Sequence, residues 1–313
     1  MIISSFDNNQ SDDWHHLASV EIPCLQKIHI KDTSEHLYIL GIARTYTQGV
    51  SDPPSLVYRM DYVNFVVERV QELPSALSAA WWDDILTLLP VEPEYTGTQP
   101  VYLYSQDTLT GRFDQRNHLM AYENYTVAHH LRVSSWDCLI LAEAPLRDLH
   151  DVSPTDIVRV ENVDLVPLTR LNVPLLSIDS IDSIQHSDFT LLAVSAQSQR
   201  GLSPVRTYKL TKQANKLDVE ELHIAYPLNC AQQYPLSKFI MVDEVPHLLI
   251  GSINEQALLF RFESDKFELV QVLAMNSALG AIHIQNRLLV MVRTDEYYQE
   301  SVSGSEKMVF ELT

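Results

Sequence analysis

The stretch Arg287-Leu288-Leu289-Val290-Met291-Val292 is a short apolar run that is followed by the polar residues Arg293-Thr294-Asp295-Glu296. A run of this length between polar residues is typical of a fully buried strand, because helices usually need longer segments. Similar runs recur along the chain, with starts about 40 to 60 residues apart, which is the spacing of propellers and solenoids. They occupy residues 37–41, 85–89, 138–142, 189–193, 248–251 and 288–291.

Each apolar run is predicted to belong to a unit of four short strands. An alternating strand precedes most runs, as in Lys27-Ile28-His29-Ile30. Two more strands follow, as in Val57-Tyr58-Arg59-Met60 and Phe65-Val66-Val67-Glu68-Arg69-Val70. Four short strands repeated at this length predict an all-β protein with the β-propeller fold. The sequence favours six blades, with seven as the alternative if residues 189–248 hold another, and a β-sandwich is the competing fold.

The two ends of the chain are predicted to complete one blade together. The C-terminal strand, residues 308–312, would supply the third strand of a unit whose other strands are residues 16–22, 26–30 and 37–41. Pairing of the C-terminal strand with N-terminal strands would close the ring and protect its edges. We therefore expect a flexible N-terminal segment at residues 1–13 and a single propeller domain at residues 14–313.

The strand pattern resembles the epilepsy-associated repeat, also called EAR or EPTP. Residues 257–292 are the clearest copy, with Leu259-Phe260-Arg261-Phe262, Phe267-Glu268-Leu269-Val270-Gln271-Val272 and the small-residue turn Ser277-Ala278-Leu279-Gly280-Ala281. Residues 57–71 are the second clearest, and weaker copies cover nearly the whole chain. The resemblance implies an extracellular or secreted β-propeller that binds other proteins.

Composition narrows the classes of partner. The formal net charge of the 313 residues is −19, which argues against nucleic-acid binding and favours another protein, one with a basic surface included. No apolar run has membrane length, so we expect no membrane insertion. The N-terminus has neither a basic n-region nor an apolar h-region, so it does not resemble a signal peptide, and a cytoplasmic location is the alternative to secretion. Only 8 residues are glycine, so Asp, Asn, Ser and Pro must form many of the turns.

Two sequons and three cysteines bear on the compartment. Asn9 and Asn124 each begin an Asn-x-Ser/Thr triplet, which would carry a glycan only if the protein is secreted. Cys24, Cys138 and Cys230 lack metal-ligand spacing, and the sequence predicts no cofactor.

Four residues are candidate anchors for a partner. Trp81-Trp82-Asp83-Asp84 lies at a predicted corner between strands, where one tryptophan would be buried and the other partly exposed. Exposed tryptophans beside carboxylates suit protein interfaces, because aromatic residues dominate binding hot spots. Trp136 precedes an apolar run at the equivalent point of the next unit, where packing between blades is the simpler interpretation. The predicted binding residues are Trp81, Trp82, Asp83 and Trp136.

Histidine pairs and repeated aspartates are the remaining polar signals. Neighbours on a strand point to opposite faces, so neither His15-His16 nor His129-His130 can direct both rings to one metal. Asp84, Asp137 and Asp188 each precede an apolar run, which favours a role in turns, with a cation in the central channel as the alternative. We predict no metal site.

No catalytic motif is visible. The chain lacks a Gly-x-Ser-x-Gly elbow, a glycine-rich phosphate loop and a His-Glu-x-x-His motif. The sequence therefore predicts a non-enzymatic scaffold for protein–protein interaction, with no catalytic residues. The alternatives are an intracellular structural subunit of a larger complex and a propeller hydrolase or lyase whose site is assembled from scattered residues.

Overall fold

The computed structural model is built of β-strands, and its described residues contain no helix. Within this described part there is accordingly no helix with the length and hydrophobicity that a membrane span requires. The described residues are 2–6, 14–19, 25–33, 35–43, 51–61, 63–64, 66–91, 99–107, 109–121, 125–142, 153–161, 164–173, 175–198, 204–228, 236–242, 244–251, 257–273, 279–285 and 288–293.

The strands are short and follow one another closely. Those of the first half are β1 (Ile2–Phe6), β2 (Trp14–Ser19), β3 (Leu25–Asp32), β4 (His36–Ala43), β5 (Ser55–Asp61), β6 (Val67–Leu73), β7 (Ala76–Trp82), β8 (Ile85–Pro90), β9 (Gln99–Gln106), β10 (Phe113–Ala121), β11 (Val127–Val133) and β12 (Trp136–Ala142). Those of the second half are β13 (Ser153–Glu161), β14 (Asp164–Val173), β15 (Leu175–His186), β16 (Phe189–Ser198), β17 (Val205–Gln213), β18 (Lys216–Ile224), β19 (Leu236–Val242), β20 (Val245–Gly251), β21 (Ala257–Glu263), β22 (Lys266–Leu273), β23 (Leu279–Gln285) and β24 (Leu288–Arg293).

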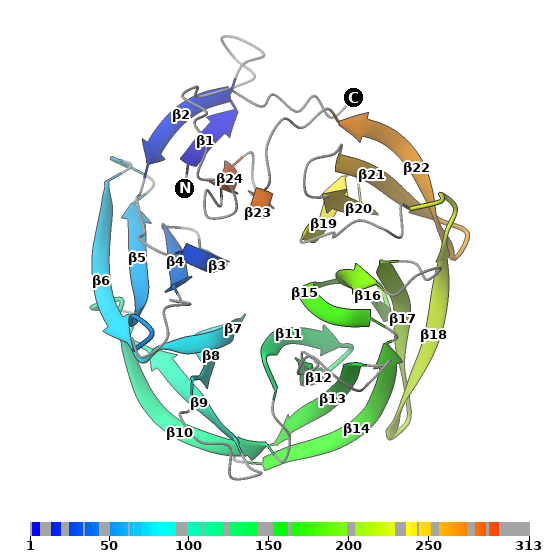
Figure 1. The fold of residues 1–313 in the computed structure, drawn as a ribbon, viewed down its shortest axis with the longest axis horizontal. Helices are drawn as coiled ribbons and strands as arrows, with labels where there is room; N and C mark the ends of the chain where they lie inside the picture. The colour runs from blue at the N-terminus through cyan, green and yellow to red at the C-terminus, as the bar shows by residue number, and fades with distance from the viewer. Residues whose placement is uncertain are drawn as a thin grey trace.

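Consecutive strands pair antiparallel in groups of four. Strands β3–β6, β7–β10 and β11–β14 each form a four-stranded sheet. Strands β15–β18 and β19–β22 form two more such groups, which a short parallel pairing of β18 with β22 joins into one eight-stranded sheet. Figure 1 shows the sheets arranged around a central axis, with β3, β7, β11, β15 and β19 innermost and β6, β10, β14, β18 and β22 at the rim. This arrangement confirms the predicted all-β, propeller-like fold.

The remaining sheet draws its strands from both ends of the chain. Its order is β2-β1-β24-β23, and Ile2 of β1 lies opposite Met291 of β24. The pairing of N-terminal with C-terminal strands is therefore present, but its composition differs from the prediction. Residues Ile2–Phe6 form a strand that pairs with β24, within the segment that we expected to be flexible. Strands β3 and β4 belong to the next sheet, and residues 308–312 lie outside the described residues.

Neighbouring sheets pack face to face, and strand β12 shows how a sheet buries both of its faces. In β12, Cys138, Ile140 and Ala142 pack with residues of β15–β18, whereas Leu139 and Leu141 pack with residues of β7–β10. Alternate residues of a strand point to opposite faces, so a strand between two neighbouring sheets needs apolar residues at every position. This explains why the second strand of each group is a continuous apolar run.

Several tight turns between strands are made without glycine. Asp83, Ser134, Ser187 and Ala214 have φ between 44° and 56°, and Ser264 and Asp265 both have positive φ in the β21–β22 turn. Backbone with positive φ suits the turns of β-hairpins. Asp84 and Asp188 lie in such turns, as the sequence predicts, whereas Asp137 lies on β12.

Side-chain hydrogen bonds join neighbouring innermost strands. The N–H of Ala79 on β7 donates to Nε2 of His29 on β3 at 3.3 Å. The N–H of Ala128 on β11 donates to Oγ of Ser78 on β7 at 3.1 Å. Because an innermost strand is the edge strand of its sheet, part of its backbone lacks a strand partner, and these side chains satisfy it.

Ser78→Ala should lower the free energy of unfolding by about 1 to 3 kcal/mol, because it leaves the buried N–H of Ala128 without its acceptor. Ser55→Ala is the matched control, since Ser55 is equally buried but its hydroxyl has no hydrogen-bond partner among the described residues. That control should change stability by no more than about 0.5 kcal/mol or increase it. Urea denaturation followed by fluorescence measures both, and equal losses would contradict the assignment.

Candidate active site

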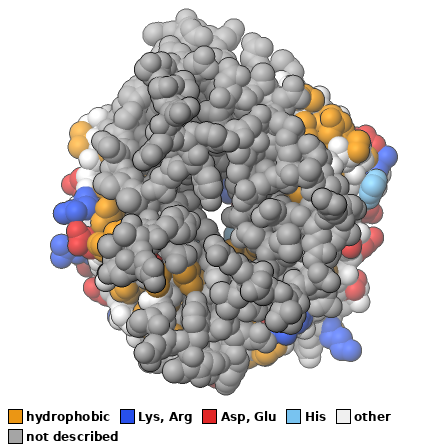
Figure 2. All heavy atoms as spheres, in the orientation of Figure 1, with side chains coloured by type: hydrophobic (Ala, Val, Ile, Leu, Met, Phe, Trp, Pro, Cys, Tyr) orange, Lys and Arg blue, Asp and Glu red, His pale blue; other side chains and the backbone are white. Residues whose placement is uncertain are grey.

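Polar side chains gather on the innermost strands around the axis. They are His29 of β3, His129 of β11, Asp182 and Ser183 of β15, and Lys238 of β19. Asp182 is buried, and the other four side chains are half-buried. The space-filling view shows an opening at the centre of the ring (Figure 2). The strands place mainly apolar residues in the core between the sheets. The polar groups next to this opening are therefore the candidates for a functional site.

A β-bulge sets the direction of the side chains on β15. The pairing register of β15 with β16 shifts between Ile178 and Ser180, so one extra residue is inserted there. As a result Ile178 and Ile181, three residues apart, both pack in the core shared with β11–β14. Ser183 then follows Ile181 on that same face, while Ser180 and Asp182 point to β19.

Strand β11 brings a histidine to Ser183. Leu131 and Val133 pack toward the β15–β18 sheet, and His129 points the same way by the two-residue period of a strand. Its Nε2 lies 2.8 Å from Oγ of Ser183, which is hydrogen-bond distance. His130 points to the other side, where its ring stacks on Trp82 of β7 with 5.0 Å between ring centroids and 10° between ring planes. The predicted opposite orientation of the two histidines is confirmed.

An ion pair lies next to the His129–Ser183 pair. Nζ of Lys238 is 2.9 Å from Oδ1 of Asp182, and the N–H of Phe239 donates to Oδ2 of Asp182 at 2.6 Å. The backbone hydrogen bond and the ammonium together balance the buried carboxylate. Lys238 keeps 29% of its side chain exposed, against 9% for Asp182.

The imidazole of His129 is kept neutral at pH 7. Burial lowers the pKa of His129 to about 4, the nearby Asp182 acts to raise it, and Lys238 and His130 act to lower it. A neutral imidazole that faces a serine hydroxyl can accept its proton, which is the relation of general base to nucleophile. The arrangement therefore has the two partners required for nucleophilic attack by Ser183.

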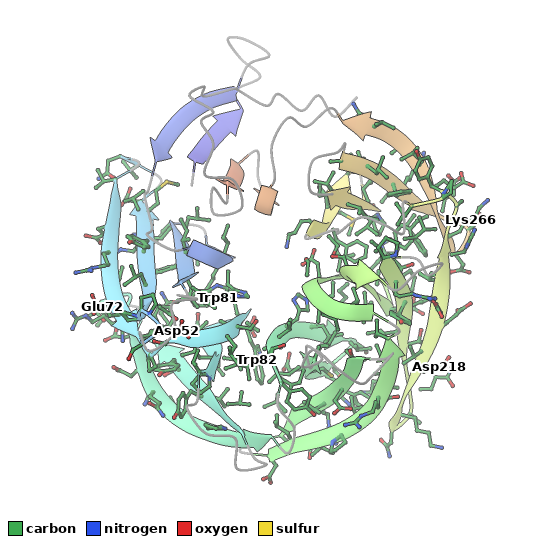
Figure 3. The ribbon with its side chains drawn as sticks, viewed as in Figure 1. Asp52, Glu72, Trp81, Trp82, Asp218 and Lys266 are labelled. Atoms are coloured by element: carbon green, nitrogen blue, oxygen red, sulfur yellow. The ribbon has the colours of Figure 1, made fainter. Side chains whose placement is uncertain are left out.

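The predicted tryptophan corner joins three sheets. Trp81 and Trp82 are labelled at the end of β7 in Figure 3. Trp81 packs on Phe113, and Trp82 stacks on His130 of the next sheet. The turn between β7 and β8 is held from both sides by cations: Nζ of Lys31 is 2.9 Å from Asp84, and a guanidinium nitrogen of Arg132 is 3.2 Å from Asp83. Asp83 is exposed and both tryptophans are half-buried. Their use as anchors for a partner stays a prediction.

The other predicted sites are placed as follows. Trp136 is buried, with Arg159 and Lys212 over its ring, so its surroundings fit packing between sheets. Asn9 and Asn124 lie outside the described residues. The described residues include no group of three or more His, Cys, Asp or Glu side chains able to hold a metal ion.

Sequence reasoning missed Ser183, Asp182 and Lys238, and it argued against a metal-binding role for His129 without assigning it a catalytic one. One signal was available: Ile-Asp-Ser occurs twice in succession at residues 178–183. The repeat places polar residues at regular intervals between isoleucines, which marks the segment as one that is partly buried and partly polar. The three-residue step concealed the strand, because only the bulge restores its two-residue alternation.

The comparisons with known proteins concern the fold. No family model and no curated protein matches the chain. Among solved structures, the periplasmic gluconolactonase of Pseudomonas aeruginosa is similar over 93% of this chain and 88% of its own, with a TM-score of 0.56 at 10% identity. An exo-β-1,3-galactanase of Phanerochaete chrysosporium with β-1,3-galactotriose is similar over 87% of this chain and 67% of its own, with a TM-score of 0.50 at 9% identity.

These similarities contradict the prediction of a non-enzymatic scaffold. That prediction depended on a repeat fold without a catalytic motif. The two solved structures named above share the fold and are enzymes, so the fold gives no reason to exclude catalysis. The absent motifs are equally uninformative, because residues far apart in sequence meet at the axis of the ring.

Proposed function

We propose that this chain is a propeller hydrolase that cleaves a neutral ester or lactone, with Ser183 as nucleophile and His129 as general base. The observation that carries the proposal is the 2.8 Å approach of His129 Nε2 to Ser183 Oγ beside the axis of the ring. Of the two enzymes with a similar fold, the gluconolactonase bears the name that fits this chemistry, because a lactone is a cyclic ester.

The described carboxylates favour acyl transfer over glycoside cleavage. Glycoside hydrolysis generally uses two carboxyl groups on either side of the scissile bond. Among the innermost strands, Asp182 is the one carboxylate whose side chain the structure describes, and it is bound to Lys238 and Phe239. A serine and a neutral histidine instead suit attack on a carbonyl carbon.

The reaction runs in two steps. Ser183 Oγ bonds to the carbonyl carbon, its proton passes to His129 Nε2, and the carbonyl π electrons move to the oxygen. When the oxyanion collapses, the bond to the leaving alkoxide breaks, and His129 returns the proton to that alkoxide. Water then attacks the acyl-serine by the same route and releases the carboxylate, which restores Ser183. A chain with a net charge of −19 repels this anionic product more than a neutral substrate.

Six blades are the count that we infer for the ring. The support is that β15–β18 and β19–β22 have the same antiparallel order as the four-stranded sheets, and their parallel link involves only His223↔Lys266 and Ile224↔Phe267. The EAR resemblance, export from the cell and a protein partner also remain proposals.

A reactive-serine probe tests the proposed function. A fluorophosphonate should label the native protein at one residue, Ser183, as located by tandem mass spectrometry, and heat-denatured protein should not react. Turnover of glucono-δ-lactone and p-nitrophenyl acetate, followed by pH-stat and absorbance, should accompany labelling. Labelling at another residue, or no turnover of either substrate by folded protein, would refute the proposal.

A further inference from the structure

We infer that the outer edge of β18 is a docking site for an extended, basic segment of a partner protein, which would add to the sheet as a further strand. The segment would carry Lys or Arg at two positions two residues apart, with an apolar residue between them. β18 lies at the rim of the ring, at the other end of the β15–β18 group from the strand that carries Ser183 (Figure 1). The inference therefore does not depend on the proposed hydrolase activity.

β18 is the one described rim strand that pairs regularly with its neighbour. It pairs with β17 at every position from Lys216 to Leu222 without a shift in register, and it contains no proline. Each of the other five rim strands, β2, β6, β10, β14 and β22, has one residue that the pairing skips. The skipped residues are Leu17, Val70, Arg116, Leu168 and Val270. Bulges and prolines are devices that protect an edge strand from the addition of another strand, and β18 has neither.

The backbone of β18 presents hydrogen-bonding groups along this edge. The N–H of Ala225 donates to the carbonyl oxygen of Phe267 on β22 at 2.8 Å, so Ala225 faces away from β17. Successive residues of a strand direct their N–H and C=O groups to opposite sides, so Leu217, Val219 and Glu221 also face outward. Among the described residues, β22 is the one strand on this edge, and it pairs with the last two residues of β18 only. These three residues can therefore pair with an added strand, as in β-augmentation.

Negative side chains flank this edge. Asp218, labelled in Figure 3, and Glu220 are exposed and two residues apart, so they lie on the same face of the strand. Lys216 is the one lysine or arginine of β18. The two lysines of β17 bind other partners, in the pairs Lys209–Asp265 and Lys212–Ser135. A strand with Lys or Arg opposite the two acids, and an apolar residue opposite the half-buried Val219, would complement this edge.

A second copy of this chain is a poor partner for the edge. Pairing of β18 with β18 of a copy around a two-fold axis is antiparallel. Every such register that joins at least two of the three outward-facing residues in each copy places an acid opposite an acid. When Val219 lies opposite Val219, for example, Asp218 lies opposite Glu220. Like charges directly opposite each other are destabilising, so the two acids oppose self-pairing and favour a basic segment.

Fluorescence anisotropy of labelled peptides tests the docking site with the full chain. The peptide Ser-Lys-Val-Lys-Val-Lys-Ser should bind saturably and at least about fivefold more tightly than Ser-Lys-Lys-Lys-Val-Val-Ser, which has the same composition without the alternation. This comparison is needed because a chain with a net charge of −19 attracts any cationic peptide.

A charge variant tests the two acids. Asp218→Asn/Glu220→Gln should weaken binding of the alternating peptide by about 3- to 10-fold, because two opposite-charge pairs are lost. Glu72→Gln/Asp114→Asn is the matched control, since it removes two exposed acids from the rim strands β6 and β10. That control should leave the affinity within about twofold of the wild-type value.

Val219→Pro tests the backbone. It removes the outward N–H at the middle of the edge but no hydrogen bond to β17, so the strand should stay in place while binding of the alternating peptide falls at least about tenfold. Val219→Ala is the control for lost side-chain packing and should bind like the wild type. Thermal unfolding shows whether each variant is folded.

Equal affinity for the two peptides, or undiminished binding by folded Val219→Pro, would overturn the inference, because attraction between net charges would then explain the binding. If Val219→Pro does not fold, amide hydrogen exchange of the wild type replaces it. The N–H groups of Leu217, Val219 and Glu221 should become protected when the alternating peptide is added, and unchanged exchange would overturn the inference. None of these measurements uses turnover, so their failure is distinct from failure of the proposed function.

Discussion

Ser183→Ala should reduce turnover of p-nitrophenyl acetate or glucono-δ-lactone by at least about 1,000-fold, and His129→Gln should do so to a similar extent. The serine supplies the attacking oxygen and the histidine removes its proton, so neither is useful without the other. Residues that act as such a unit show non-additive losses, so the double variant should be little worse than either single variant.

The matched control for the nucleophile is on the same strand. Ser180→Ala removes a hydroxyl that bonds to Ser237 on β19, so it perturbs the contact between the sheets without touching His129. Its turnover should stay within about threefold of the wild-type value. Steady-state kinetics of the wild type and the four variants, with thermal unfolding to show that each is folded, makes the comparison. Equal losses in Ser180→Ala and Ser183→Ala would mean that the serines act on structure only.

The pH dependence of this activity should distinguish His129 from an ordinary histidine. Because the pKa of His129 is lowered to about 4, its ring stays neutral well below pH 6.5. Initial rates should therefore be nearly constant from pH 7.5 to about 5.5, over which the protein remains folded.

Strands that are buried on both faces could be predicted from the sequence. The runs at β4, β8, β12, β16 and β20 are apolar at nearly every position because they are buried on both faces, and a one-dimensional pattern reveals that directly. Innermost strands are harder. Strand β7 is built of Leu, Ser and Ala before its tryptophans, and β15 repeats Ile-Asp-Ser around a bulge, so neither has a simple alternation.

The candidate site could not be predicted for a different reason. His129 and Ser183 are 54 residues apart, and their meeting depends on the placement of β11 beside β15 on adjacent sheets. This separation reflects the length of a repeat. Unlike the spacing within a local catalytic motif, it does not mark the two residues as a pair. The tryptophan corner was conspicuous in sequence, yet its contacts mainly join sheets.

Acid should destabilise the protein strongly between pH 6.5 and pH 4. Burial lowers the pKa of both His129 and His130 to about 4, from 6.5 in the unfolded chain. Below pH 6.5 the unfolded state binds protons that the folded state does not, so the stabilisation present at higher pH is lost as the pH falls. At pH 5 this proton binding lowers the free energy of unfolding by about 2 kcal/mol for each histidine, or about 4 kcal/mol for the pair.

His130→Phe isolates one of these contributions. Phenylalanine can keep the stacking on Trp82 but cannot bind a proton, so the loss of unfolding free energy between pH 7.5 and pH 5 should shrink by about 2 kcal/mol. In the double variant His129→Gln/His130→Phe, the loss of unfolding free energy between the two pH values should shrink by about twice as much as in His130→Phe. Protonation of the many carboxylates of the chain is common to all three proteins and cancels in the comparison. Urea denaturation at both pH values measures the differences, and identical pH dependence in all three would show that neither imidazole is held neutral by the fold.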